Sequence, residues 1–277
     1  MKPTKNVILS GATGFIGQHL VPILLKNNYK IIAITRDLKK AKKLDWFKDV
    51  EFINCNLHIE HPQIKLTEDS GLIHLAWQGL PNYQSTFHIE ENLPRNYNFI
   101  KSLVQKGLKH ALITGTCLEY GFQYGPLSTL HKPSPQNPYA IAKNTLRKNL
   151  ETFSKEKTFT LQWARCFYMY GKGQSPNSIL SQLDEAIDKK EKNFNMSGGE
   201  QLRDYLPVEK VAQHLFDLYI SKKPGTYNIC SGHPISIRRL VEEHIKERNS
   251  NIKLNLGHFP YPNYESMAFW GVPNFPK

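Results

Sequence analysis

The stretch NVILSGATGFIGQHL, residues 6–20, decides the fold, because a short apolar run meets three evenly spaced glycines and then a helical pattern. Glycines at positions 11, 14 and 17 permit a tight turn, close backbone approach to a pyrophosphate and close packing of the helix on the strand. The helix N-terminus adds N–H donors and a partial positive charge. The segment therefore predicts a dinucleotide site, with a plain turn as the alternative. Its candidate residues are Gly11, Thr13, Gly14, Phe15, Ile16 and Gly17.

Comparable apolar runs alternate with helical stretches through the first part of the chain, for example KIIAIT at 30–35 and HALITG at 110–115. This alternation predicts an α/β fold built on a doubly wound parallel sheet, a Rossmann fold, with ligands at the carboxyl ends of the strands. Further on, the composition shifts to Gly, Pro, Ser and Asn. We expect a dinucleotide-binding domain at 1–170 and a smaller C-terminal substrate-binding lobe at 171–277, with segments near 205–230 returning to the first domain.

The end of the second predicted strand, IIAITRD, bears on which dinucleotide binds. A carboxylate there would hold a ribose 2′-hydroxyl, whereas Thr35 followed by Arg36 suits a 2′-phosphate. A charge-assisted contact of about 1.5–3 kcal/mol would favour the phosphorylated cofactor by one to two decades. Asp37 could pair with Arg36 or reach the ribose itself. NADP(H) is therefore the preferred cofactor and NAD(H) the alternative.

The composition limits the classes of partner. No apolar run approaches the ~18 residues that span a bilayer, and the formal net charge is +12, with lysines interleaved with acidic residues. This pattern is typical of solvated faces and disfavours nucleic-acid binding. The four cysteines are 49 or more residues apart, so we expect neither a metal site nor a redox pair among them. From this spacing we expect the protein to lie in a reducing cytoplasm. The cysteines are Cys55, Cys117, Cys166 and Cys230.

A tyrosine four residues before a lysine occurs four times, so the spacing alone says little. Tyr139 and Lys143 stand out because SPQNP precedes them and YAIAKNTLRKNLE continues as a helix, which places both side chains on one face. Thr116 ends the strand HALITGT, 23 residues before Tyr139. The other pairs are Tyr97/Lys101, Tyr168/Lys172 and Tyr219/Lys223.

These three side chains form a candidate catalytic set. An ammonium beside a phenol stabilises the phenolate, so we expect Lys143 to lower the pKa of Tyr139 and make it a usable acid or base. The Thr116 hydroxyl would hydrogen-bond the reacting oxygen. The predicted chemistry is proton transfer to a carbonyl that also faces the dinucleotide.

With these motifs, the chain resembles the extended short-chain dehydrogenase/reductases of the nucleotide-sugar epimerase/dehydratase group over nearly its whole length. HLAWQG, residues 74–79, resembles the segment that covers the cofactor, and ENLPRN resembles the family's helix-start asparagine. Asn56-Leu57 stands where the family usually has an acidic residue near the adenine. The resemblance implies further cofactor contacts at Asn56, Leu57, Leu75, Ala76, Trp77, Asn92 and Thr114.

The second half resembles the family's sugar-nucleotide lobe. In GGEQLRDYLPVEKVA, Arg203 matches the arginine that holds the diphosphate, with a salt bridge to Asp204 or a nearby acid as the alternative. Glu119 is a candidate ligand for a sugar hydroxyl or, equally, a structural partner. Two departures affect the sugar: Tyr168 replaces a frequent asparagine, and the tail YPNYESMAFWG lacks the usual Arg-x-x-Asp. The candidate substrate residues are Gln78, Thr116, Glu119, Tyr168, Asn177 and Arg203.

The active-site loop separates the possible reactions. Family 4,6-dehydratases carry an Asp-Glu pair after the threonine, where this chain has Cys117 and Leu118, so dehydration is disfavoured. TCLEYG, AWQGLPNY and YESMAFWG are most similar to family reductases of the kind that form dTDP-fucose. The resemblance thus implies NADPH-dependent reduction of the 4-keto group of a nucleotide-diphosphate 4-keto-6-deoxyhexose, in deoxysugar biosynthesis for a surface polysaccharide such as O-antigen.

Two other functions stay open. One is an NAD-dependent nucleotide-sugar C4-epimerase, which returns the hydride to the same sugar and needs no phosphate-selecting Arg36. The other is a non-catalytic dinucleotide sensor or RNA-binding relative, for which the basic surface would matter. The resemblance also implies a homodimer formed through helices near 92–106 and 139–154.

Overall fold

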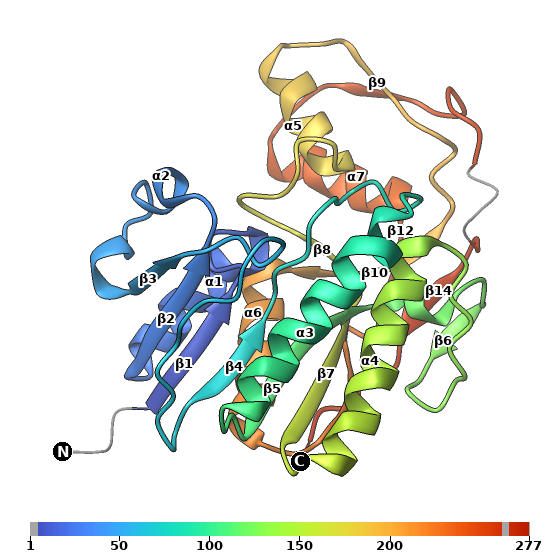
Figure 1. Ribbon diagram of the computed structural model, residues 1–277. Helices are drawn as coiled ribbons and strands as arrows, with labels where there is room; N and C mark the ends of the chain where they lie inside the picture. Colours follow the sequence, from blue (N-terminus) through green and yellow to red (C-terminus); the bar gives the residue numbers. More distant parts are fainter. Residues whose placement is uncertain (1–4, 262–265, 277) are drawn as a thin grey trace.

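The computed structural model describes residues 5–261 and 266–276 (Figure 1). Its centre is a seven-stranded sheet in the order β11-β7-β5-β4-β1-β2-β3, and every neighbouring pair runs parallel. The predicted doubly wound fold is confirmed. The strands are β1 (Lys5–Ser10), β2 (Tyr29–Thr35), β3 (Glu51–Asn54), β4 (Gly71–His74), β5 (His110–Thr116), β7 (Thr160–Cys166) and β11 (Gly225–Ile229).

The strand order reverses between β1 and β4, where Val7 lies opposite both Ile31 of β2 and Gly71 of β4. The carboxyl ends of β1, β4 and β5 therefore lie side by side at the switch point of the sheet. In open α/β sheets ligands bind in the crevice at this point. The glycine loop follows β1 directly, which places it at the crevice.

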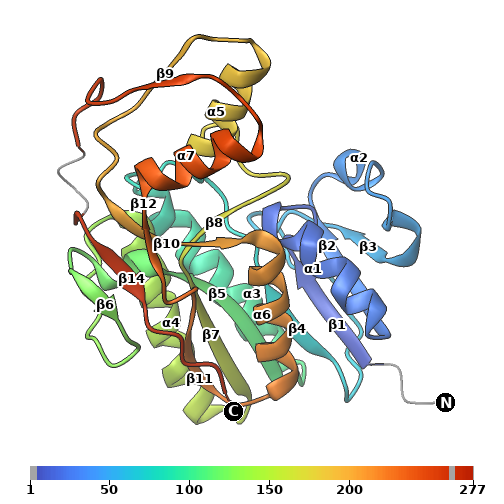
Figure 2. The ribbon, with the colours of Figure 1, turned by 180° about the vertical axis from the view of Figure 1, so that it is seen from behind.

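Helices cover both faces of the sheet (Figures 1 and 2). On one face α1 (Phe15–Lys26) packs against α6 (Val208–Ser221), and on the other α3 (Leu93–Gln105) packs against α4 (Pro138–Glu156). Each face has its own apolar core, with Leu20 and Leu215 in the first and Phe99 and Leu146 in the second. Burial on both sides explains why every residue of β4 and β5 is buried.

Short elements complete this part of the chain. After β2 the chain forms α2 (Leu38–Ala41) and a 3₁₀ turn, η1 (Phe47–Asp49). A π-helical turn, η2 (His88–Asn92), leads into α3, and a second 3₁₀ turn, η3 (Cys117–Tyr120), follows β5. The last two turns carry side chains of the candidate site.

A smaller lobe lies beyond the carboxyl edge of the sheet and contains α5 (Ile179–Asp188) and α7 (Ile237–Glu247), which pack on a separate apolar core (Figure 1). The division at residue 170 stays a prediction. The structure does place α6 on α1 and β11 beside β7, on the main sheet. The lobe strands are β8 (Tyr168–Tyr170), β9 (Asn193–Asn195), β10 (Leu202–Pro207), β12 (Pro234–Ser236) and β13 (Lys253–Asn255), and β6 (Gly125–Leu127) pairs with β14 (Phe269–Gly271).

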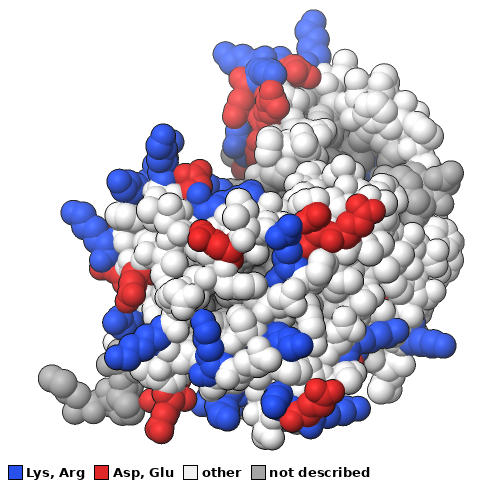
Figure 3. Space-filling model, in the orientation of Figure 1, with Lys and Arg blue, Asp and Glu red and all other residues white. Residues whose placement is uncertain are grey.

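Three parts of the sequence predictions lie outside the described residues: the first four residues of the 1–170 domain, positions 262–265 of the tail YPNYESMAFWG and the last residue of the 171–277 lobe. Within the described residues, no helix is both long and apolar enough to cross a bilayer. Figure 3 shows basic and acidic side chains interleaved over the face of Figure 1. On that face the positive balance is spread among acidic neighbours, which agrees with the expected solvated surface.

Candidate active site

The glycine loop has the geometry that a pyrophosphate needs. Gly11 has φ +79°, and a Cβ added there would lie 2.9 Å from the backbone nitrogen of Ala76. A Cβ at Gly17 would lie 2.2 Å from the carbonyl oxygen of Gly11, so helix and loop meet too closely for any side chain. Gly14 precedes α1, and in the described chain neither a capping side chain nor an acidic first-turn residue occupies this helix start. Its N–H groups and dipole therefore suit a phosphate, and the residues present fit a dinucleotide.

The end of β2 leaves the arginine available. Asp37 caps α2, because its carboxylate accepts a hydrogen bond from the backbone N–H of Lys40 at 2.9 Å. Its own N–H donates to the Thr35 hydroxyl at 3.2 Å. Arg36 is exposed at this strand end. The carboxylate that could have paired with Arg36 or reached a ribose is thus engaged in a local turn.

A buried polar chain ties the glycine loop to the segment predicted to cover the cofactor. The Ser10 hydroxyl lies 2.7 Å from His74 Nδ1 and accepts from the Ala76 N–H at 3.3 Å, while the Ser10 carbonyl accepts from the Leu75 N–H at 3.1 Å. On its other side His74 Nε2 lies 2.7 Å from Asn96 Oδ1. Burial lowers the pKa of His74 to about 3, so the ring is neutral, with Nε2–H donating to the amide. The sequence analysis did not predict this series of hydrogen bonds.

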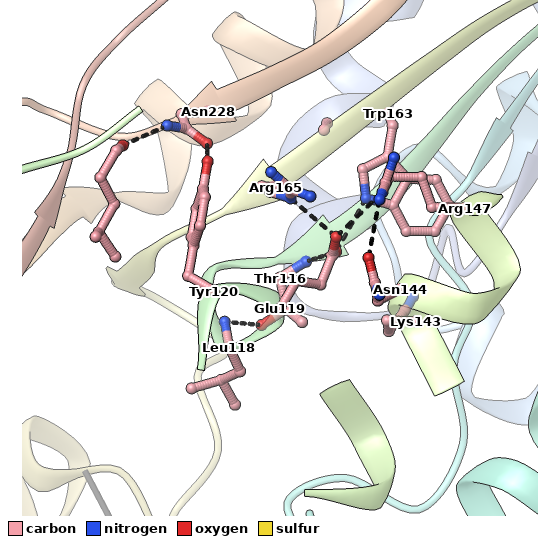
Figure 4. A network of polar contacts seen from close by, with 12 residues as sticks. Thr116, Leu118, Glu119, Tyr120, Lys143, Asn144, Arg147, Trp163, Arg165 and Asn228 are labelled. Carbon is pink, nitrogen blue, oxygen red and sulfur yellow. Dashed lines mark hydrogen bonds and ion pairs between the residues drawn. The ribbon is translucent and has the colours of Figure 1, made fainter. Parts of the chain in front are cut away.

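Thr116 ends β5 and begins the turn η3. Its Oγ1 accepts from the Leu118 N–H at 3.2 Å, and its own N–H donates to Glu119 Oε1 at 2.9 Å, which forms a reciprocal cap (Figure 4). The hydroxyl proton of Thr116 therefore remains for another acceptor. The turn holds this hydroxyl at the carboxyl end of the sheet.

Glu119 is the centre of a buried network that Figure 4 shows. Besides Thr116, its Oε1 accepts from the Trp163 indole N–H at 2.9 Å, and its Oε2 accepts from Arg165 Nε at 2.8 Å and lies 3.8 Å from Arg147 Nε. The carboxyl group is 0% exposed. Protein partners bind both oxygens, which favours the structural alternative, in which Glu119 holds the turn that carries Thr116. Binding of a sugar hydroxyl by Glu119 stays a prediction.

The predicted tyrosine and lysine lie where the sequence placed them. Asn137 caps α4 by accepting from the Ala140 N–H at 2.9 Å, and Tyr139 and Lys143 are 7% and 2% exposed. The Tyr139 hydroxyl shares a hydrogen bond with Thr116. Lys143 Nζ donates at 2.8 Å to the carbonyl oxygen of Thr114, which precedes Thr116 on β5. The three candidate catalytic side chains thus converge between β5 and α4.

The direction of the tyrosine shift differs from the prediction. Burial raises the pKa of Tyr139, and the charge of Tyr83 adds to this, whereas the hydrogen bond from Thr116 lowers it. Burial also lowers the pKa of Lys143 to about 7, against an opposing effect of Glu119. Loss of water around the phenol is the largest cause of the shift in the pKa of Tyr139, and the sequence could not show it. At neutral pH Tyr139 is a neutral phenol with a proton to donate.

Three rings that sequence reasoning did not assign to catalysis surround the phenol. The ring centroids of Trp77, Tyr83 and His88 lie 6.0, 5.4 and 5.3 Å from that of Tyr139. The Tyr139 N–H also donates to the Tyr83 carbonyl at 3.1 Å. The available signal was spacing, since His88 lies one helical turn before Asn92, a predicted cofactor residue.

The other predicted cofactor and substrate residues near η2 form a linked edge. Asn92, at the end of the π turn, donates to the Gln78 carbonyl at 2.9 Å, and the Gln78 side chain donates to Asn56 Oδ1 at 3.3 Å. Leu57 packs partly buried on the second core. Asn177 is exposed before α5, away from these contacts in the chain. The adenine and substrate roles of these residues stay predictions.

Arg203 lies buried on β10 among aromatic rings. Its guanidinium carbon is 4.6 Å from the ring centroid of Phe269 and 5.9 Å from that of Tyr168. The neighbouring Asp204 accepts backbone N–H groups at 231–232, at 2.7 and 2.9 Å. The Asp204 carboxylate thus binds backbone N–H groups and does not form the salt bridge to Arg203 that was the alternative. Binding of a diphosphate by Arg203 stays a prediction.

Comparisons with known proteins agree with this geometry. The family model described as NAD dependent epimerase/dehydratase matches residues 7–230. A dTDP-6-deoxy-L-talose 4-dehydrogenase (NAD(+)) from Aggregatibacter actinomycetemcomitans is 34% identical, over 96% of this chain and 99% of that protein. CDP-abequose synthase from Salmonella typhimurium is 26% identical over 84% and 77%.

Among solved structures, UDP-glucuronic acid 4-epimerase from Bacillus cereus, in complex with UDP-glucuronic acid and NAD, superposes with a TM-score of 0.81. The match covers 97% of this chain and 90% of that one at 20% identity, and it shows the shared fold. The family model and the full-length relative together confirm the family that the glycine loop, Thr116, Tyr139 and Lys143 predicted. The chain belongs to the NAD dependent epimerase/dehydratase family of nucleotide-sugar-modifying extended short-chain dehydrogenase/reductases.

Proposed function

We propose that this oxidoreductase reduces the 4-keto group of a nucleotide-diphosphate 4-keto-6-deoxyhexose to the 6-deoxyhexose, with NADPH as the hydride donor. The observation that carries the proposal is the convergence of Thr116, Tyr139 and Lys143 at the carboxyl edge of the sheet that also carries the glycine loop. The relative named as a dTDP-6-deoxy-L-talose 4-dehydrogenase, similar over nearly all of both chains, supports C4 of a nucleotide-linked 6-deoxyhexose as the reacting carbon.

The protein's part in the reaction is to hold the carbonyl and supply a proton. When bound, the reduced nicotinamide supplies a hydride to C4. The hydroxyls of Thr116 and Tyr139 share a hydrogen bond in the structure. With substrate bound, both would face the C4 oxygen, and Tyr139 would transfer its phenolic proton to that oxygen. The raised pKa of Tyr139 keeps this proton in place until the oxygen becomes basic. Solvent then restores the proton to the phenolate.

Lys143 supports the transfer in two ways. Its ammonium, buried like the phenol and one helical turn from it on α4, would stabilise the phenolate left after proton transfer. It would also donate to the nicotinamide ribose, a role that the family resemblance implies. Elimination is disfavoured because Cys117 and Leu118 provide no carboxyl pair after Thr116.

Arg36 supports the choice of NADPH. It is exposed at the end of β2, and the neighbouring Asp37 is engaged in capping α2. Arg36→Ala should reduce affinity for NADPH by about ten- to a hundred-fold and leave NADH affinity unchanged. Titration of intrinsic fluorescence with each cofactor measures this. Equal losses for both cofactors, or no loss for either, would refute the assignment. NADH is the informative comparison because the 34% identical relative is named as an NAD(+) enzyme.

The deciding experiment follows oxidation of NADPH with 4-keto-6-deoxyhexoses linked to dTDP, CDP, GDP and UDP. Tyr139→Phe should lower kcat by about 10²–10⁴-fold without weakening cofactor binding. Tyr97→Phe is the matched control, because Tyr97 has the same spacing to Lys101 but lies on α3 against Phe153. Full activity of Tyr139→Phe, or indifference to every sugar nucleotide with normal cofactor binding, would refute the proposal.

A C4-epimerase is the second candidate, because a UDP-glucuronic acid 4-epimerase shares the fold with a TM-score of 0.81. It would copurify with NAD and interconvert C4 epimers with no net change in nicotinamide absorbance. A sensor or RNA-binding relative would show salt-sensitive RNA affinity and no turnover. The same purified protein distinguishes the three outcomes.

The assembly and location stay proposals. We propose a cytoplasmic homodimer in which α3 and α4, which lie side by side on one face of the sheet, meet their counterparts. Light scattering of the purified protein tests the assembly, and a monomer at every concentration would contradict it.

A further inference from the structure

Lys143 is held by an aromatic face. Its Nζ lies 4.1 Å from the ring centroid of Trp77 and donates one hydrogen bond, to the Thr114 carbonyl at 2.8 Å. The lysine is 2% exposed, so water does little to solvate the ammonium. A cation over an indole face inside a dry site is attracted far more strongly than at a surface. Trp77 is thus a principal partner of this charge.

The Trp77 ring is itself fixed by His88. The Trp77 indole N–H donates to His88 Nδ1 at 3.1 Å, and the two rings stack with their centroids 6.2 Å apart. Asn92 Nδ2 also lies 3.0 Å from His88 Nδ1. His88 Nε2 therefore carries the proton and donates to the Asn82 carbonyl at 2.9 Å. His88 is fully buried, and this set of bonds allows the indole one orientation.

Other charged and titratable groups act on the same ammonium from neighbouring elements. Glu119 of η3 and Cys166 of β7 raise the pKa of Lys143 and so favour its charged form. The Lys143 ammonium in turn lowers the pKa values of His74 on β4 and His88 on η2. Glu119 is already bound by Arg165 and by backbone and indole N–H groups. The carboxylate acts on Lys143 at longer range, and the indole is the partner in contact.

We propose that Trp77, oriented by His88, is a positioning residue whose indole face holds the Lys143 ammonium in its charged form beside Tyr139. The inference rests on the proposed function, in which that charge stabilises the phenolate. Removing the indole face should leave Lys143 buried but poorly solvated. The neutral amine would then be favoured, and the alkaline limb of the kcat profile for reduction would move to lower pH.

The test measures the charge of Lys143 directly, without turnover. Lysines labelled with carbon-13 at Cε are titrated by NMR in the full-length protein, and Lys143→Met identifies the resonance. In Trp77→Leu the titration midpoint of Lys143 should fall by about one pH unit or more, equivalent to a tenfold loss of the charged form. Trp77→Phe, which keeps a weaker aromatic face, should give an intermediate midpoint and guards against failure of the leucine variant to fold. Lys101, which lies 5.7 Å from the Tyr97 ring centroid, is the unchanged internal control.

The role of His88 is tested in parallel. His88→Asn keeps an acceptor for the indole N–H, so the titration midpoint of Lys143 should stay close to that of the native protein. His88→Ala removes the acceptor and should lower the midpoint, as Trp77→Leu does. An unchanged Lys143 midpoint in folded Trp77→Leu and Trp77→Phe would overturn the inference. A lowered midpoint in a protein that reduces no sugar nucleotide would support the indole's hold on the charge while refuting the proposed function, so the two failures are distinct.

Discussion

Replacing Glu119 with Gln should destabilise the fold by about 3–5 kcal/mol. Gln keeps one oxygen, which can still accept from the Thr116 N–H and the Trp163 indole, because both bind the same carboxylate oxygen. Its amide group would replace the other oxygen, which lies 2.8 Å from Arg165 Nε, so two donors would face each other. Arg165 is 2% exposed, and water cannot replace the lost partner. The estimate is the cost of leaving a buried guanidinium without its counter-charge.

The assay is urea unfolding followed by far-UV circular dichroism. Domains are stable by about 5–15 kcal/mol, so this loss should move the midpoint strongly while leaving the slope unchanged. Glu151→Gln is the matched control. That carboxylate pairs with Arg147, but its side chain is 41% exposed, so the same chemical change should cost at most about 1 kcal/mol.

The outcome separates two roles for Glu119. A variant within about 1 kcal/mol of the native protein would show that Arg165 does not depend on this carboxylate, and the reasoning from burial would be refuted. Unchanged stability with a selective rise in KM for the sugar nucleotide would restore Glu119 as a substrate ligand. A large loss of stability supports the structural role that the geometry indicates.

Two further predictions concern Lys143 and the glycine loop. Because burial lowers the folded pKa of Lys143 to about 7, whereas an unfolded lysine titrates near about 10.4, the unfolded chain carries an extra proton between these values. Native stability therefore rises with pH across this window, by up to about 1.4 kcal/mol per pH unit. Lys143→Met should lose that rise, and parallel stability curves for the two proteins would contradict it. Gly11→Ala should abolish dinucleotide binding in a folded protein, because its Cβ would lie 2.9 Å from the Ala76 nitrogen at φ +79°; calorimetry that finds native affinity would disprove this.

The features that were predicted correctly from the sequence depend on residues that are close together in the chain. The glycine loop, the strand before it and the helix after it are contiguous, and the alternation of strands and helices predicts the parallel, doubly wound sheet. Thr116 and Tyr139 converge because one ends a central strand and the other begins the next long helix. The family's topology brings such ends together at one edge of the sheet.

The features that it missed depend on pairing between distant strands. Arg165 reaches Glu119 because β5 and β7 pair with Gly115 opposite Arg165, 46 residues from Glu119 in the chain. No local sequence pattern predicts the register in which β5 and β7 pair. The pKa of Tyr139 was predicted in the wrong direction for a related reason: spacing shows which groups are near, but only packing shows how much water they lose.

The two buried cations of the site have different partners, and the difference suits their roles. Arg165 is structural and is neutralised by Glu119 at 2.8 Å. In the proposed reaction, Lys143 would respond to a negative charge that appears on Tyr139 only during proton transfer. A carboxylate in contact with Lys143 would hold the ammonium but would repel the phenolate as it forms, which would cancel much of the ammonium's effect. The Trp77 face, 4.1 Å from Nζ, attracts the cation without net charge. In the proposed mechanism, the Lys143 ammonium would therefore have no carboxylate in contact with it and would be free to stabilise the phenolate that proton transfer creates.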